Sequence, residues 1–142
     1  MEKSIIYQIF PRYWGDRAGK QKKGGTLDEN GCGKFSNIDT ESLDYFKSLG
    51  ITHLWLTGIV RHATGESTGG CRASSPDWVK GRAGSPYAIT DYYDVNPYLA
   101  DVPERRMEEF RDLVTRMHEA GLKVIIDFVP NHVARDYAAF TE

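Results

Sequence analysis

A chain of 142 residues with 40% hydrophobic side chains is long enough to bury the core of one ordinary domain and too short for two. The 18 Lys and Arg against 20 Asp and Glu give a formal charge of −2 without a basic block, which argues against a nucleic-acid surface or a polybasic membrane patch. No apolar run approaches the roughly 18 residues that a membrane span needs. We therefore expect neither nucleic acid nor a membrane among the partners.

The two cysteines, Cys32 and Cys71, lie in glycine-rich stretches that lack the spacing of a zinc site or a disulfide framework. They fit a reducing compartment, and a single disulfide is also compatible with them. The chain enters a strand-like run at once, so the localisation expected from the sequence as given is cytoplasmic. A signal peptide upstream would instead make the protein secreted or periplasmic.

Strand-like and helix-like segments alternate along the chain. Compact β-branched and aromatic runs predict strands, and apolar residues at helical spacing predict helices. In chain order these are a strand at about 4–10, a helix at about 40–49, a strand at about 52–57, a helix at about 102–120 and a strand at about 124–129. The first run, closed by Pro11, is typical of a strand buried on both faces. The order predicts an α/β fold of parallel strands joined by right-handed crossovers.

The ends of both helices carry signals of their own. Asp39 is an N-cap residue for the first helix, and Gly50 follows where a left-handed C-terminal cap is expected. Before the second helix, Asp101 and Glu104 have the spacing of a capping box. We therefore expect that helix to begin at about residue 102.

The connections between the elements are unequal in length. Each helix reaches its next strand in two or three residues, whereas the strands lead into their helices through long segments at roughly 11–37 and 58–100. In α/β folds the functional residues lie on loops that follow the carboxyl ends of the strands. These segments are thus the expected working face, and the alternative is that their glycines simply make them mobile.

Polar residues follow the last predicted strand. Asp127 stands in an otherwise apolar run, so a buried position would require hydrogen bonds or an ion pair. Asn131 offers an oxygen of the kind that calcium accepts, and His132 offers a donor or an acid/base group. The plainer alternative is that Asp127 pairs with a neighbouring strand and that Asn131 and His132 form a turn.

Tyrosines gather in residues 85–98, ahead of the second helix. Such a ring can cover the apolar face of a sugar while its hydroxyl bonds at the sugar's edge. For most of these tyrosines, packing of the segment against the domain is the competing interpretation. His53 lies in a predicted strand, His118 lies on the predicted long helix, and His62 lies in a loop without a partner at a telling spacing, which indicates structural or solvated roles.

Several segments together resemble the α-amylase family of glycoside hydrolases. Residues 6–12 (Ile-Tyr-Gln-Ile-Phe-Pro-Arg) and 50–57 are similar to the first two barrel strands of that family. Residues 121–132 end in Asp-x-x-x-Asn-His, which is similar to its first signature region, with Ser-Pro-Tyr and Asp-Tyr upstream. The resemblance covers nearly the whole chain. It implies the first three β/α units of a TIM (β/α)₈ barrel that cleaves or transfers α-glucosidic bonds with retention of configuration.

The resemblance also implies roles for individual residues. Tyr87 would stack on the sugar next to the cleaved bond, and His132 would hydrogen-bond a hydroxyl of the same sugar. Asp127 would organise the active site without acting as nucleophile or acid. Asn131 matches a position that ligates calcium in many members, so calcium is the implied metal, and no organic cofactor is implied. Ala88 replaces an Asp frequent in relatives that act on short oligosaccharides, which favours an amylase-type glucan substrate.

The family's nucleophile, its acid/base Glu and a third essential Asp come from its fourth, fifth and seventh strands, beyond the segments matched here. Retaining hydrolysis needs two carboxyl groups about 5–5.5 Å apart. We therefore expect residues 1–142 to be the N-terminal part of the catalytic barrel of a retaining hydrolase of starch or maltooligosaccharides, inactive alone.

Two other interpretations stay open. One is a non-catalytic carbohydrate-binding module that uses Tyr87 and His132, and the other is a small complete α/β domain of three strands. A three-stranded piece of a barrel leaves open sheet edges and an uncovered apolar face. We therefore expect the chain on its own to self-associate.

Overall fold

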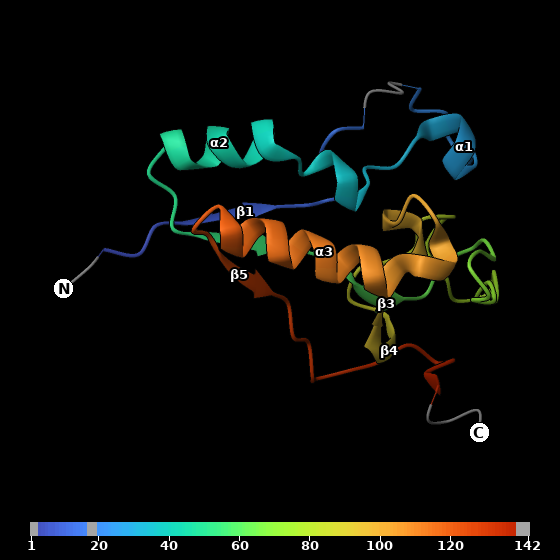
Figure 1. Cartoon of the computed structure of the whole chain (residues 1–142). Coiled ribbons are helices and arrows are strands. Elements are labelled where there is room, and N and C mark those ends of the chain that lie inside the picture. Colours follow the sequence, from blue (N-terminus) through green and yellow to red (C-terminus); the bar gives the residue numbers. More distant parts are fainter. Residues whose placement is uncertain (1–2, 17–19, 139–142) are drawn as a thin grey trace.

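The computed structural model describes residues 3–16 and 20–138, and its centre is a three-stranded parallel sheet with helices alongside (Figure 1). In chain order the elements are β1 (Ile6–Ile9), α1 (Leu27–Asn30), α2 (Thr40–Ser48), β2 (His53–Leu56), β3 (Val60–His62), β4 (Ile89–Val95), α3 (Arg106–Glu119) and β5 (Lys123–Ile126). Short 3₁₀ helices occupy Phe35–Asn37, Pro97–Leu99 and Pro103–Arg105. Within the described residues no helix is both long and apolar enough to cross a membrane.

The parallel sheet has the order β1-β2-β5, with Gln8 opposite Trp55 and Trp55 opposite Ile125. It is an open sheet, so the three parallel strands, with α2 and α3 as the helices between them, form an incomplete (β/α)₈ barrel, as expected from the sequence. Each strand is four residues long and shorter than the run that predicts it. The regular pairing is confined to the stretch where all three strands run side by side.

The helices bury one side of the central strand. Leu54 and Leu56 of β2 are fully buried, and they belong to one core with residues of α2 and α3, among them Leu43, Phe46, Leu113 and Met117. The outer strands are covered less well, because each pairs along one edge only. Ile6 of β1 is 55% exposed and Ile126 of β5 is 46% exposed. The prediction that the first strand is buried on both faces is therefore wrong for this chain.

The helix ends agree with the sequence in one case and differ in the other. Asp39 caps α2 by accepting the Ser42 backbone N–H at 2.9 Å, and Gly50 has a positive φ of 74°. The predicted capping box of Asp101 with Glu104 is wrong. The Glu109 carboxylate accepts the backbone N–H groups of Asp101 and Val102 at 2.7 and 2.8 Å, so the partner lies within α3 itself.

The long segment after β2 is more ordered than the sequence predicts. It contains a second sheet in which β3 and β4 pair antiparallel, and β4 covers much of the tyrosine-rich stretch expected to be a loop. The β-branched and aromatic residues of Ile89–Val95 favour a strand. Asp94 fixes β4 to α3 by accepting from Arg106 Nε and Nη2, both at 2.8 Å.

The returning end of this segment lies tightly against its start. Gly84 has a φ of +67°, and a Cβ there would collide with the Ala63 carbonyl oxygen. Four residues on, Ala88 accepts the Ala63 backbone N–H at 2.8 Å. The stretch that leads to Tyr87 is thus fixed by backbone contact on both sides.

Candidate functional site

The carboxyl ends of β1, β2 and β5 meet at one edge of the parallel sheet, and the polar residue at the end of β5 is Asp127. Its Oδ1 accepts the indole N–H of Trp55 at 2.5 Å, and its Oδ2 accepts the Gly58 backbone N–H at 3.3 Å. The carboxylate is thereby held by β2 and by the turn that follows it. This is the pairing with a neighbouring strand that the plainer sequence interpretation describes, and it also suits an organising role.

The turn after β2 accepts only glycine. Gly58 has a φ of +73°, and a Cβ at this position would collide with the Phe10 ring and lie 2.9 Å from Pro86 Cβ. The missing side chain lets the residues before Tyr87 approach the end of β1. A Gly-containing turn directly after a strand was the available sequence signal for this contact.

Tyr87 lies at the junction of two hollows on this edge. One, of about 510 Å³, extends from this edge over the open face of the sheet, and it is lined by Tyr87, Asp127 and Trp55 together with apolar residues that include Ile6 and Ile125. The other, of about 320 Å³, is lined by Tyr87 together with Phe10 and neighbouring residues. The Tyr87 side chain is 42% exposed, so its ring is available to a ligand. Volumes of this size fall in the range of small-molecule sites.

Asn131 and His132 lie apart from these hollows, since neither belongs to the described residues that line them. Both are exposed, and Asn131 Nδ2 lies 2.8 Å from His132 Nδ1. The structure therefore brings together Asp127 and Tyr87 of the residues singled out by sequence. A sugar shared by Tyr87 and His132 stays a prediction.

The residues around Asn131 do not by themselves make a calcium site. Calcium takes six to eight oxygen ligands, and Asn131 supplies one side-chain oxygen. No group of three or more His, Cys, Asp or Glu side chains suited to a metal gathers within residues 3–16 and 20–138.

Aromatic contacts anchor the segment that follows β5. The Tyr92 hydroxyl on β4 donates to the Val129 carbonyl oxygen, and the Tyr92 ring lies 5.4 Å from that of Phe128 and 5.8 Å from that of Tyr137. Tyr92 therefore packs, as the competing interpretation of the tyrosine cluster holds. The second sheet thereby fixes the wall of the larger hollow.

A buried polar network connects the loops after β1 and β2. The Nε2 atom of His62 lies 3.0 Å from both Arg12 Nη2 and Asn96 Nδ2, and its Nδ1 lies 3.0 Å from the Val60 carbonyl oxygen. Because Arg12 and Asn96 present donors, Nε2 accepts and Nδ1 carries the proton, which makes the ring neutral. Burial lowers the pKa of His62 to about 4 from its ordinary 6.5, and burial lowers the pKa of Arg12 as well. His62 has the structural role expected of it, with partners the sequence spacing did not reveal.

Three parallel strands joined through α2 and α3, with a carboxylate and an aromatic ring at their carboxyl edge, define part of a TIM-barrel enzyme domain. The family model described as "Alpha amylase, catalytic domain" matches residues 8–142. The chain therefore belongs to the α-amylase family.

The chain is similar to several members of this family. It is 33% identical over 141 residues to the trehalose-6-phosphate hydrolase of Bacillus subtilis, covering 99% of this chain and 19% of that protein. It is 30% identical over 137 residues to alpha-amylase 3 of Dictyoglomus thermophilum, covering 96% of this chain and 20% of the relative. A solved alpha-amylase from Lactobacillus plantarum superimposes with a TM-score of 0.64 at 31% identity, covering 97% of this chain and 25% of that structure. The chain thus spans about a fifth of the length of the curated relatives it matches.

Proposed function

We propose that the chain is the N-terminal part of the catalytic domain of a retaining hydrolase that acts on α-linked glucans or maltooligosaccharides. The observation that carries the proposal is that Asp127 and Tyr87 line one hollow, which begins at the carboxyl edge of the sheet and continues over its apolar face. Family membership supports the reaction class, and the half-exposed ring of Tyr87 supports a sugar ligand, because an aromatic face buries the apolar face of a pyranose.

Asp127 acts in this proposal as an organiser. One of its oxygens accepts from Trp55 and the other from Gly58, so the carboxylate is bonded both to β2 and to the turn that follows it. His132 would reach the sugar through Nε2, since its Nδ1 contacts Asn131. These two residues position the substrate and perform no bond cleavage.

The cleavage itself requires groups from elsewhere in a complete catalytic domain. Retaining hydrolysis uses a nucleophile and an acid/base, two carboxyl groups about 5–5.5 Å apart. Among the described residues that line the two hollows, Asp127 is the one carboxylate. We therefore propose that the 142-residue chain binds part of the sugar and lacks the carboxyl groups that cleave the glycosidic bond.

Substitution of Tyr87 in a protein that carries the complete catalytic domain tests this function. Tyr87→Ala should lower kcat/KM for maltoheptaose by at least tenfold, because the sugar loses its platform, whereas Tyr87→Phe should retain most of the activity. Tyr93→Ala is the matched control, since Tyr93 is 91% exposed on β4 and lines neither hollow. Unchanged kinetics in Tyr87→Ala, or sustained turnover by the purified 142-residue chain, would contradict the proposal.

We also propose that the chain alone self-associates through its open sheet. β1 and β5 each pair along one edge only, and Ile6, Ile126 and Phe128 are 55, 46 and 72% exposed. Unpaired strand edges beside apolar side chains are a template for pairing with another chain. Sedimentation at micromolar concentration should show oligomers, and Ile126→Lys should weaken them more than Tyr93→Lys does. A monodisperse wild-type monomer would disprove the association.

A further inference from the structure

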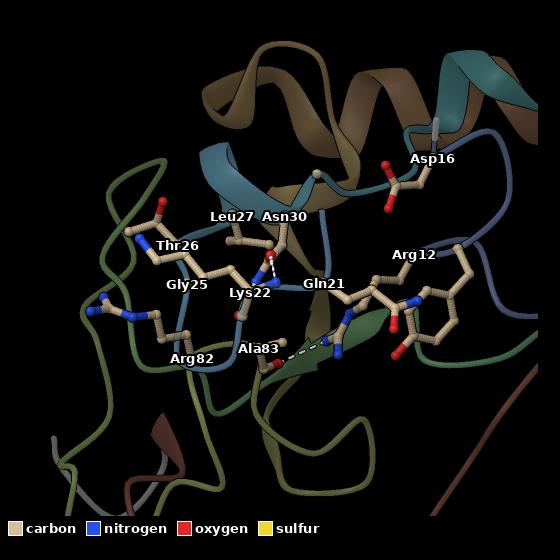
Figure 2. A pocket seen from close by; sticks show the side chains of 12 residues that line it. Arg12, Asp16, Gln21, Lys22, Gly25, Thr26, Leu27, Asn30, Arg82 and Ala83 are labelled. Carbon is tan, nitrogen blue, oxygen red and sulfur yellow. Dashed lines mark hydrogen bonds between the residues drawn. The ribbon is translucent and has the colours of Figure 1, made fainter. Parts of the chain in front are cut away.

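A further hollow of about 560 Å³ lies between the loop that follows β1 and the segment that joins β3 to β4 (Figure 2). Tyr13, Gln21 and Asn30 line it on one side, and Arg82 and Ala83 line it on the other. The Tyr13 side chain is 69% exposed. The hollow thus combines an accessible aromatic ring with polar side chains, in the size range of small-molecule sites.

The two walls of this hollow are tied together by hydrogen bonds. Arg12 Nη2 donates to the Ala83 carbonyl oxygen at 2.8 Å, as Figure 2 shows, and Arg82 Nε donates to the Gly24 carbonyl oxygen at 2.9 Å. Each tie joins a side chain of one loop to the backbone of the other. The hollow is consequently formed before a ligand arrives, which lowers the entropic cost of binding.

The loop that follows β1 is also stabilised by hydrogen bonds within itself. The Lys22 backbone N–H donates to Asn30 Oδ1 at 2.7 Å, and Asn30 Nδ2 donates back to the Lys22 carbonyl oxygen at 2.9 Å. A capping box of Thr26 with Glu29 fixes the short helix α1 between them. This wall is therefore a folded turn with its own reciprocal bonds.

Aromatic rings lead from the candidate site to this hollow. Phe10 lines the smaller hollow together with Tyr87, and the Phe10 ring packs edge-on against Tyr13 at 5.2 Å between centroids. The Arg12 guanidinium lies 5.2 Å from the centroid of the Phe10 ring, and Arg12 also lines the hollow of about 560 Å³. A chain-like ligand that stacks on Tyr87 would thus find a second ring at Tyr13.

The charged groups of the hollow favour a neutral ligand, because the Asp16 carboxylate lines it as well and the cations that line it already have partners. Lys22 forms an ion pair with Glu29, Arg82 lies 3.3 Å from Glu66, and Arg12 is engaged by Ala83 and the buried network. A phosphate would have to compete with these partners for the cations, whereas ligand hydroxyl groups can exchange hydrogen bonds with the Gln21 amide while the Asn30 amide keeps its bonds to Lys22. A polyhydroxyl ligand is favoured over an anion.

We propose that this hollow binds a further glucose unit of an α-glucan, beyond the unit at Tyr87, with Tyr13 as its aromatic platform. The hollow then determines specificity, because long chains gain a contact that short chains cannot reach. This inference rests on the proposed function. It adds the prediction that the protein discriminates by chain length.

The test compares maltoheptaose with maltotriose in a protein that carries the complete catalytic domain. Tyr13→Ala should lower kcat/KM for maltoheptaose roughly five- to tenfold, the value of one aromatic contact, and change that for maltotriose less than twofold. Tyr13→Phe should keep the preference for the long chain, because it keeps the ring. The control Tyr93→Ala should leave both substrates unchanged.

The other possible outcomes contradict different parts of the proposal. An equal loss on both substrates, or no loss on either, would overturn the role of Tyr13. A wild-type preference for trehalose 6-phosphate that Lys22→Ala abolishes would overturn the neutral ligand in favour of a phosphate. Wild-type protein that hydrolyses neither glucan would refute the proposed function itself.

Discussion

The two sheets of this molecule are stabilised by different kinds of contact. The parallel sheet of β1, β2 and β5 buries its central strand under α2 and α3 and leaves apolar residues of its outer strands exposed. The antiparallel pair of β3 and β4 is closed by polar contacts, with His62 buried between Arg12 and Asn96 and with Asp94 paired to Arg106. The first sheet depends on further apolar partners, whereas the second is completed by hydrogen bonds within the described chain.

The largest expected effect lies in the centre of the parallel sheet. Leu54→Ala should lower the free energy of unfolding by about 4 kcal/mol, because Leu54 is fully buried and its removal leaves a cavity. Ile126→Ala on the outer strand should cost less than about 1 kcal/mol, since its side chain is already 46% exposed. Urea denaturation of both variants, at one protein concentration low enough for sedimentation to show monomer, measures both costs. Similar costs at the two positions would show that the outer strand is buried in solution.

Gly84 tests the close packing of the second region. Gly84→Ala should cost about 3 kcal/mol, because the added methyl collides with the Ala63 carbonyl and the backbone has a positive φ. Gly81→Ala is the matched control in the same segment, with a φ of +66° and nothing within 4 Å of the new Cβ. It should lose about 1 kcal/mol from its conformation alone. Equal losses in urea denaturation would rule out the close approach.

The pH dependence of stability should reveal the buried histidine. The pKa of His62 is lowered to about 4 in the folded chain from its ordinary 6.5, so the unfolded state binds the extra proton. Stability is complete above pH 6.5 and is lost as the pH falls toward 4, by about 2 kcal/mol between pH 7 and pH 5. His62→Gln should flatten this part of the profile, and an unchanged slope in that variant would contradict the assignment.

The parallel architecture was predictable because its signals are local and strong. Apolar runs closed by Pro11, an N-cap at Asp39 and a left-handed Gly50 agree with the structure. The start of α3 was not predictable. Glu109 replaces Glu104 as the partner of the preceding turn, and spacing alone does not distinguish two nearby glutamates. The second sheet was not predictable either, because β3 has only three residues and pairs with β4, a strand far from it in the sequence.

The candidate site, too, was predictable from the sequence only in part. Asp127 was recognisable as a polar residue in an apolar strand, and Tyr87 as a ring in a loop on the working face. Their shared hollow depends on Gly58 and Trp55, whose contacts join segments about 30 and 70 residues apart in the chain. Such contacts are set by tertiary packing and have no local pattern.

The hydrogen bond from Trp55 to Asp127 also bears on how the sheet assembles. Side chains alternate faces along a strand, so pairing β5 with β2 one residue out of step would turn Asp127 toward the helices and away from the indole. The carboxylate would then lose its hydrogen bonds to Trp55 and Gly58. Apolar strands alone tolerate such slippage more readily. The two hydrogen bonds of Asp127 thus favour the observed strand alignment, independently of any substrate.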